Sequence, residues 1–489
     1  MDSKNLKLPR WEIWSVIFIL LVAAFARLYK IPDYMTFLGD EGRDALVVRD
    51  IVKGIHFPLI GPGTSVGSMY LGPLYYYLVA PSLLLFNFSP VGLAAEVAVF
   101  GVLTVALLWW VGRRWFGVIP ALTVSLLYAL SPAVITYSRS SWNPNIMPFF
   151  AMLSMYGTWK IRETGVWRWF PVVAVSLAFV LNSHYLGLLL LPIVILYLLL
   201  SKNIFKSKKV ILISFVIFLF LMSPLVLFDM RHNWVNFNAM RVFFTDRQNT
   251  VNIKAYKALP FIWPIWNDIV SHLLTAGNIF LGQIISAILG LFIFVKIIQR
   301  RFQPELVFTL VWVGVGLVGL GLYRQHIYVH YYGFLFPAVF LLLGFLFKSL
   351  SKRFITVIIS LTIFGLLLSF EILANPFRFS GNLQLRRTTV ISQFITKEAD
   401  GQKFNLALIS HTNYDAGYRY IFKLLNSPYT TIHDRLAGQL FVICEIPDCK
   451  PIGNPLWEVA AFGWAKIDRK WDFPWGVTLY RLIHNPSGT

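Results

Sequence analysis

The feature that most constrains this chain is its series of long apolar segments. About eleven segments of roughly 16–22 residues carry few charges, and that length suits an α-helix that crosses a bilayer. Hydrophobic residues make up 57% of the chain and charged residues 13%. A soluble domain could not hide that much apolar surface behind a polar exterior. The sequence therefore predicts a mainly α-helical, polytopic membrane protein, with spans at about 12–31, 91–112, 118–137, 145–162, 168–184, 186–201, 209–228, 278–298, 305–323, 332–349 and 354–373.

Basic residues between the predicted spans indicate their orientation. If successive loops alternate sides, every second short loop is basic, and such loops are typical of the cytoplasmic side. We therefore expect a cytoplasmic N-terminus and, after an odd number of spans, an extracytoplasmic C-terminal segment. The net charge of +20 is then explained by topology and lipid headgroups rather than nucleic acid, for which no binding motif is present. The basic loops contain Arg113 and Arg114, Lys160 and Arg162, residues 202–209, Lys296 with Arg300 and Arg301, and residues 348–353.

Three long segments are predicted outside the cytoplasm, at about 32–90, 229–277 and from 375 onward. Within the first, Tyr70–Phe88 is predicted to lie along the membrane interface, because another crossing would reverse every later loop. We divide the chain into a membrane domain, 1–374, and a small soluble α/β domain, 375–489, which has short apolar segments bounded by turn residues. Cys444 and Cys449 lie in the second part, and their spacing allows a disulfide without requiring one.

The densest polar cluster, Asp40-Glu41-Gly42-Arg43-Asp44, follows the first predicted span. Acidic residues at a membrane surface do not help topology, so the cluster is a candidate for chemistry. Two structural alternatives stay open. Asp40 could cap the helix that follows, or it could form a local ion pair with Arg43 on one helix face.

Further polar residues are expected on the same side of the membrane. Outward-facing arginines oppose the positive-inside bias, so they indicate either a bound anionic group or headgroup contacts. The segment Gly61–Ser68 is glycine-rich, but it lacks the lysine of a phosphate-binding loop and is interpreted as a flexible loop. The candidates are His56, Tyr75, Arg139, Asn143, Arg231, Arg324, His330 and Tyr331.

The order Asp40-Glu41, Arg43, Arg49-Asp50 and Gly72-Pro73-Leu74-Tyr75-Tyr76-Tyr77 resembles the first external loop of glycosyltransferase family 39. That family includes protein O-mannosyltransferases and lipid A aminoarabinose transferases and has the C-type glycosyltransferase fold. The resemblance continues through Arg139 and Asn143 to His330 and Tyr331.

The resemblance implies an enzyme of the cytoplasmic membrane that moves a sugar, with inversion, from a polyprenyl-phosphate donor to an extracytoplasmic protein, lipid or glycan. Asp40, with Glu41, matches the catalytic acidic position, where a carboxylate would take the proton of an acceptor hydroxyl. Arg139, Arg231 and Arg324 would stabilise the donor phosphate. Arg43, His56, Tyr75, Asn143, His330 and Tyr331 are expected near the substrates.

Departures from the family pattern bear on metal binding. Leu71 and Gly72 stand where relatives that act on lipid A carry an acid and a lysine, and Asn143 and Asn145 stand where an acid is frequent. Both weaken the case for a divalent metal, which favours several carboxylate oxygens. No cofactor is therefore assigned, and a divalent metal stays open as a weakly supported alternative. The alternative functions are a transporter or flippase of lipid-linked sugars, and a polymerase or ligase of envelope glycans.

Overall fold

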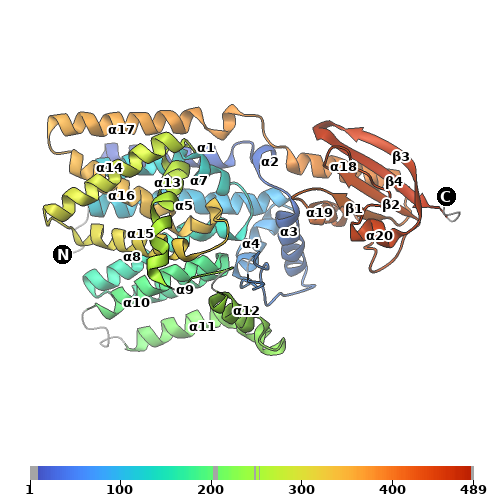
Figure 1. Ribbon diagram of the computed structural model, residues 1–489, viewed down its shortest axis with the longest axis horizontal. Coiled ribbons are helices and arrows are strands. Elements are labelled where there is room, and N and C mark those ends of the chain that lie inside the picture. The colour runs from blue at the N-terminus through green and yellow to red at the C-terminus, as the bar shows by residue number, and fades with distance from the viewer. Residues whose placement is uncertain (1–8, 66, 202–207, 247–248, 253, 486–489) are drawn as a thin grey trace.

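The computed structural model describes residues 9–485 except 66, 202–207, 247–248 and 253. It consists of a body of long helices and a smaller sheet domain at one end, with the first described residues at the other end (Figure 1). The fold therefore matches the predicted combination of a helical membrane part and a small α/β domain.

Each predicted span corresponds to helical structure. The helices are α1 (Arg10–Leu28), α5 (Pro90–Phe116), α6 (Val118–Leu130) with α7 (Pro132–Tyr137), α8 (Met147–Thr164), α9 (Trp169–Ser183), α10 (Leu191–Leu199), α11 (Lys208–Arg231), α14 (Ile279–Ile298), α15 (Pro304–Leu322), α16 (Phe336–Leu350) and α17 (Phe354–Leu373).

Seven helical segments within the described part of the chain are long and apolar enough to cross a membrane. Shorter apolar helices such as α6 and α9 add to them, so the number eleven stays a prediction. Burial separates central from peripheral segments. In the apolar window of Val329–Leu350, 83% of the residues are buried, against 6% in α11 and 17% in α17. A helix that is apolar all round and buried lies at the centre, whereas α11 and α17 leave apolar side chains for lipid to cover.

At the end of the body opposite the sheet domain, basic residues form ion pairs and hydrogen bonds between the ends of neighbouring helices. Arg113, at the end of α5, pairs with Glu12 in the first turn of α1. Lys348, at the end of α16, donates to the Trp115 carbonyl at 2.9 Å and to Gln303 at 2.8 Å. Figure 1 places the turns after α14 and α16 at this same end. The basic loops therefore gather on one side, as the alternating topology requires; residues 202–207 of the predicted basic loop lie outside the described residues.

Further helices lie in the first two segments that the sequence predicts outside the cytoplasm. Near the sheet domain lie α3 (Gly39–Val52) and α4 (Leu74–Leu85), the latter within the segment predicted at the interface (Figure 1). The second external segment forms α12 (Val235–Thr245) and α13 (Leu259–Leu274). Helix α13 was not predicted. It buries an apolar face against α14 and α15, although Pro264 and Asp268 interrupt its hydrophobic pattern.

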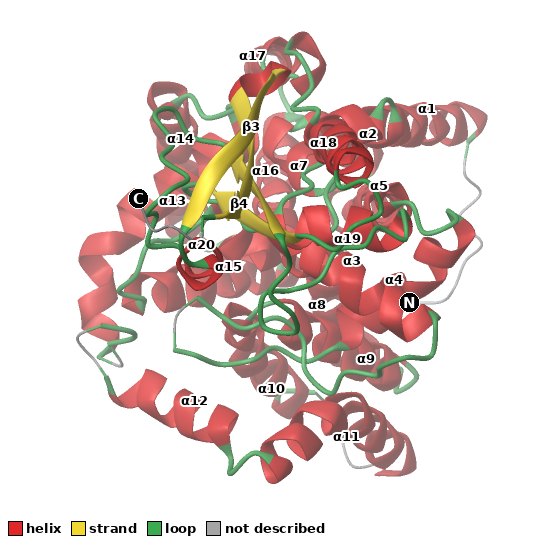
Figure 2. Ribbon diagram, turned by 90° about the vertical axis from the view of Figure 1, so that its right-hand side faces the viewer, coloured by secondary structure: helices red, strands yellow, loops and turns green. Residues whose placement is uncertain are grey.

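The C-terminal part contains a four-stranded sheet of order β1-β2-β4-β3. β1 (Asn405–Ile409) pairs in parallel with β2 (Gln439–Cys444), whereas β4 (Val477–His484) is antiparallel to both β2 and β3 (Ala465–Phe473). Alternate residues of β1 and β2 point to opposite faces. One face packs against α18 (Gln384–Glu398) and α19 (Ala416–Leu424), and the other against α20 (Trp457–Phe462), as Figure 2 shows.

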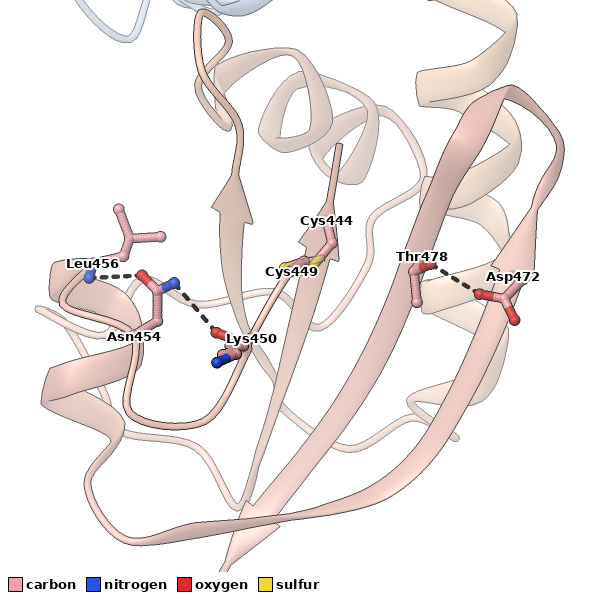
Figure 3. The surroundings of a disulfide bond; sticks show 7 residues. All are labelled: Cys444, Cys449, Lys450, Asn454, Leu456, Asp472 and Thr478. Carbon is pink, nitrogen blue, oxygen red and sulfur yellow. Dashed lines mark hydrogen bonds between the residues drawn. A yellow bond between two sulfur atoms is a disulfide. The ribbon is translucent and has the colours of Figure 1, made fainter. Parts of the chain in front are cut away.

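The two cysteines are joined in this domain. The Cys444–Cys449 disulfide closes the turn after β2, and Asn454 in the following loop donates to the Lys450 carbonyl at 3.2 Å (Figure 3). A disulfide in this position agrees with an oxidising compartment for the C-terminal domain.

Candidate active site

A cavity of about 450 Å³ opens at the end of the helical body that carries α3. Segments far apart in the sequence form its wall. They are the start of α3, the turn that precedes α4, the start of η1 (Asn143–Ile146) with the residue before it, the residues that follow α9 and the first turn of η5 (Val329–Leu335). The lining residues are Asp40, Arg43, Pro62, Gly63, Thr64, Ser65, Leu71, Trp142, Asn143, Pro144, His184, Tyr185, His330 and Tyr331.

Arg43 connects two carboxylates of α3. Its Nη1 donates to Asp40 Oδ1 at 2.8 Å, and its Nη2 and Nε donate to Asp44 Oδ1 at 2.8 and 3.0 Å. Asp44 is fully buried and also accepts from the Tyr76 hydroxyl at 3.0 Å. Burial raises the pKa of Asp44, and Arg43 opposes that shift. The predicted ion pair between Asp40 and Arg43 is therefore present, and Asp40 is 43% exposed at the cavity.

The capping alternative for Asp40 is wrong. The helix begins after Leu38, whose backbone N–H donates to the Glu41 carboxylate at 3.0 Å. Glu41 therefore takes the role of the glutamate in a capping box. It is only 5% exposed and does not line the cavity. Burial raises its pKa to about 7, whereas the hydrogen bond from Leu38 acts in the opposite direction.

Imidazole and aromatic rings form another part of the cavity wall. The His330 ring lies 4.2 Å from the Trp142 ring, and the His184 ring lies 4.5 Å from the Tyr331 ring. Asn143 is held by donating to the Ser183 carbonyl at 2.6 Å. The predicted site residues Asp40, Arg43, Asn143, His330 and Tyr331 therefore meet in one cavity.

His184 also lines the cavity, although the sequence does not single it out. It follows directly on α9, and its Nδ1 accepts from the Leu186 backbone at 3.2 Å. In the sequence, His184 is a lone histidine at the end of an apolar segment. Such a residue indicates a functional site only when a second histidine, here His330, is known to lie nearby. Their rings are 6.3 Å apart.

The segment 61–65 corrects the interpretation of a flexible loop. Gly61 N–H donates to the Leu71 carbonyl, and Thr64 N–H donates to the Met69 carbonyl, both at 2.7 Å. Gly63 and Tyr70 form an antiparallel bridge. These bonds make a hairpin whose tip supplies Thr64 and Ser65 to the cavity.

Several predicted residues lie outside the cavity lining. Tyr75 is buried, with its hydroxyl 2.8 Å from Ser141 Oγ, and His56 is exposed beyond α3. Arg139 is buried, donates to the Tyr29 carbonyl at 3.0 Å and lies over the Tyr34 and Phe377 rings. Arg231 is exposed at the end of α11, and Arg324 lies over the Phe261 ring at 5.5 Å.

The cavity lining offers one carboxylate, Asp40, whereas a hard divalent metal favours several. Among residues 9–485, apart from the undescribed gaps, no three His, Cys, Asp or Glu side chains converge as ligands. The carboxylates of Asp40 and Asp44 instead share an ion pair with Arg43.

The helical body, the external helices and the cavity define a membrane protein of the C-type glycosyltransferase fold. Over 96% of the chain the structure matches ArnT from Cupriavidus metallidurans, solved with undecaprenyl phosphate, with a TM-score of 0.61, 13% identity and 98% coverage of ArnT. It also matches the Archaeoglobus fulgidus oligosaccharyltransferase over 88% of this chain and 65% of that one, with a TM-score of 0.55 and 14% identity. At such identities the likeness shows the fold.

The sequence itself carries the family resemblance. Residues 71–228, from just before α4 to near the end of α11, match the family model of dolichyl-phosphate-mannose-protein mannosyltransferases. This match confirms the predicted resemblance to glycosyltransferase family 39. No curated protein sequence matches the chain.

Proposed function

We propose that this protein is a membrane glycosyltransferase that moves a sugar from a polyprenyl-phosphate donor to an acceptor outside the cytoplasm, with inversion at the anomeric carbon. One observation carries the proposal. A partly exposed carboxylate, Asp40, lines a cavity at the α3 end of the helical body in a C-type glycosyltransferase fold.

Asp40 acts as the general base. Both hydrogen bonds that reach it from described residues use Oδ1, from Arg43 and from Tyr414, each at 2.8 Å. The other oxygen is therefore left for the acceptor hydroxyl. The carboxylate takes the hydroxyl proton as the acceptor oxygen attacks the anomeric carbon, and the sugar–phosphate bond breaks.

The leaving group is a polyprenyl phosphate, which needs charge stabilisation more than protonation. Arg43 is the lining residue with a permanent positive charge, although two carboxylates share it. Arg139, Arg231 and Arg324 remain candidates for the donor phosphate. Arg231 fits best a phosphate at membrane level, because it is exposed at the end of the lipid-facing helix α11.

The two alternatives have less support. A transporter would be expected to carry paired halves and polar groups near the middle of the membrane, whereas this cavity lies at the end of the helical body. A glycan polymerase or ligase would share the topology, but the family match at residues 71–228 favours transfer from a lipid monophosphate sugar.

We place the protein in the cytoplasmic membrane, with the N-terminus inside and the sheet domain outside. The basic loops at the end opposite the sheet domain support that orientation. Residues 1–374 are then the membrane domain, with the catalytic first external loop at 32–90, and residues 375–489 are the soluble domain. The acceptor is a protein, a lipid or a glycan.

The test compares Asp40→Asn with Glu41→Gln in proteoliposomes. Undecaprenyl phosphates that carry ¹⁴C-labelled mannose, glucose or arabinose are offered separately, with envelope extract as acceptor. We expect Asp40→Asn to lower transfer at least 100-fold, because an amide cannot accept the proton. Glu41→Gln is the matched control, since it neutralises the adjacent carboxylate outside the cavity. Undiminished transfer by folded Asp40→Asn, or movement of intact donor across the bilayer without cleavage, would contradict the proposal.

A further inference from the structure

The soluble domain supplies a side chain that touches the proposed base. Tyr414 lies in the segment that leads into α19, and its hydroxyl donates to Asp40 Oδ1 at 2.8 Å. Arg43 Nη1 in turn donates to the Tyr414 hydroxyl at 3.3 Å. Burial raises the pKa of Tyr414, so its hydroxyl keeps the proton that it donates to Asp40. The three groups form a closed set of hydrogen bonds between the two parts of the chain.

This contact belongs to a close fit between α3 and the soluble domain. Gly39 N–H donates to Asn413 Oδ1 at 2.9 Å. A Cβ added at Gly39 would lie 2.2 Å from the Tyr414 ring, and one at Gly42 would lie 2.2 Å from the Gly417 nitrogen. Glycines at two positions of α3 therefore allow α19 and the segment before it to approach the helix backbone.

The segment that carries Tyr414 is also braced from within the soluble domain. Asn413 Nδ2 donates to the Glu445 carboxylate at 3.1 and 3.2 Å, and the Tyr418 hydroxyl donates to it at 3.0 Å. Arg387 pairs with Glu445 at 2.9 Å. Glu445 follows directly on Cys444, which ends β2 and is linked to Cys449, so these bonds connect the segment to the sheet.

We propose that Tyr414 is a positioning residue for Asp40. It restrains the carboxylate through Oδ1, so that the other oxygen faces the cavity where the acceptor hydroxyl must lie. The soluble domain therefore completes the active site rather than only covering it. This inference rests on the proposed function, because it assumes that Asp40 is the base.

The test is Tyr414→Phe, which removes one hydroxyl and keeps the ring. Tyr420→Phe is a matched control, because Tyr420 lies on α19 and its hydroxyl donates across the same interface, to the Phe88 carbonyl at 2.6 Å, without contacting Asp40. We expect Tyr414→Phe to lower the transfer rate at saturating donor about tenfold, as a lost hydrogen bond to a charged group would. Affinity for undecaprenyl phosphate, measured by thermophoresis, should stay within about twofold of wild type in both variants, as should the Tyr420→Phe rate.

Rescue gives a second measurement. Incorporation of 4-aminophenylalanine at position 414 keeps an N–H donor at the same place and should restore most of the rate, whereas 4-methylphenylalanine should not. This pair replaces the phenylalanine variant if that variant does not fold. An unchanged rate in Tyr414→Phe, an equal fall in Tyr420→Phe, or equal rates for the two analogues would overturn the inference. Loss of transfer in Asp40→Asn together with any of these results leaves the proposed function intact, whereas undiminished transfer in Asp40→Asn contradicts the proposed function itself.

Discussion

The buried carboxyl of Glu41 makes the stability of this protein depend on pH. Its pKa is raised from 4.5 to about 7 in the folded state, chiefly by burial. Between these values the folded protein binds more protons than the unfolded chain, so stability falls as the pH rises. The stability that the protonated Glu41 carboxyl contributes is fully present below about pH 4.5 and is lost as the pH rises through about 7. A pKa difference of this size corresponds to about 3 kcal/mol, as an upper estimate.

Glu41→Gln removes this dependence. The glutamine cannot ionise, and its side-chain oxygen can still accept the hydrogen bond from the Leu38 backbone. At pH 8 we therefore expect the variant to be more stable than wild type by up to about 3 kcal/mol and to unfold at a higher temperature. At pH 4.5 the two proteins should unfold at nearly the same temperature. The assay is thermal unfolding of both proteins in one detergent at both pH values.

Two results would refute the reasoning. If Glu41→Gln were no more stable than wild type at pH 8, burial would not disfavour the ionised form of this carboxyl. If the variant lost transfer activity to the extent of Asp40→Asn, Glu41 would take part in the chemistry, as the family resemblance first implied, and its capping role would be secondary.

Two further predictions concern Arg43 and the disulfide. Arg43→Met should lower the free energy of unfolding by about 3 kcal/mol, because it leaves the buried Asp44 without its ion pair. Adding Asp44→Asn should recover part of that loss in thermal unfolding. Strictly additive effects of the two substitutions would contradict the pairing. Replacing Cys444 and Cys449 by serine should cost about 2 kcal/mol, since the bridge closes a short loop. Because the chain has only these two cysteines, dithiothreitol can reduce no other bridge. It should make the wild-type C-terminal domain as sensitive to protease as the double variant. Protease resistance that dithiothreitol leaves unchanged would contradict a stabilising bridge.

The sequence by itself determined the class of protein, the positions of most helices and the acidic cluster after the first span. The length of an apolar segment and the charge of a loop are local properties of the sequence, and they determine directly which segments cross a bilayer and in which direction. The same patterns missed α13, where Pro264 and Asp268 interrupt the hydrophobic run, and β3, whose residues are largely exposed.

Only the tertiary structure decided which polar residues meet. Asp40 and Arg43 are neighbours in sequence, but Tyr414 reaches Asp40 across 374 residues, and His184 reaches the cavity from the end of a different helix than His330. The tertiary structure also distinguishes the two neighbouring acids: Glu41 is buried and caps α3, whereas Asp40 faces the cavity. The physical reason is that a helix turns successive side chains about 100° apart, so adjacent acids acquire opposite surroundings only when the helix packs against its neighbours.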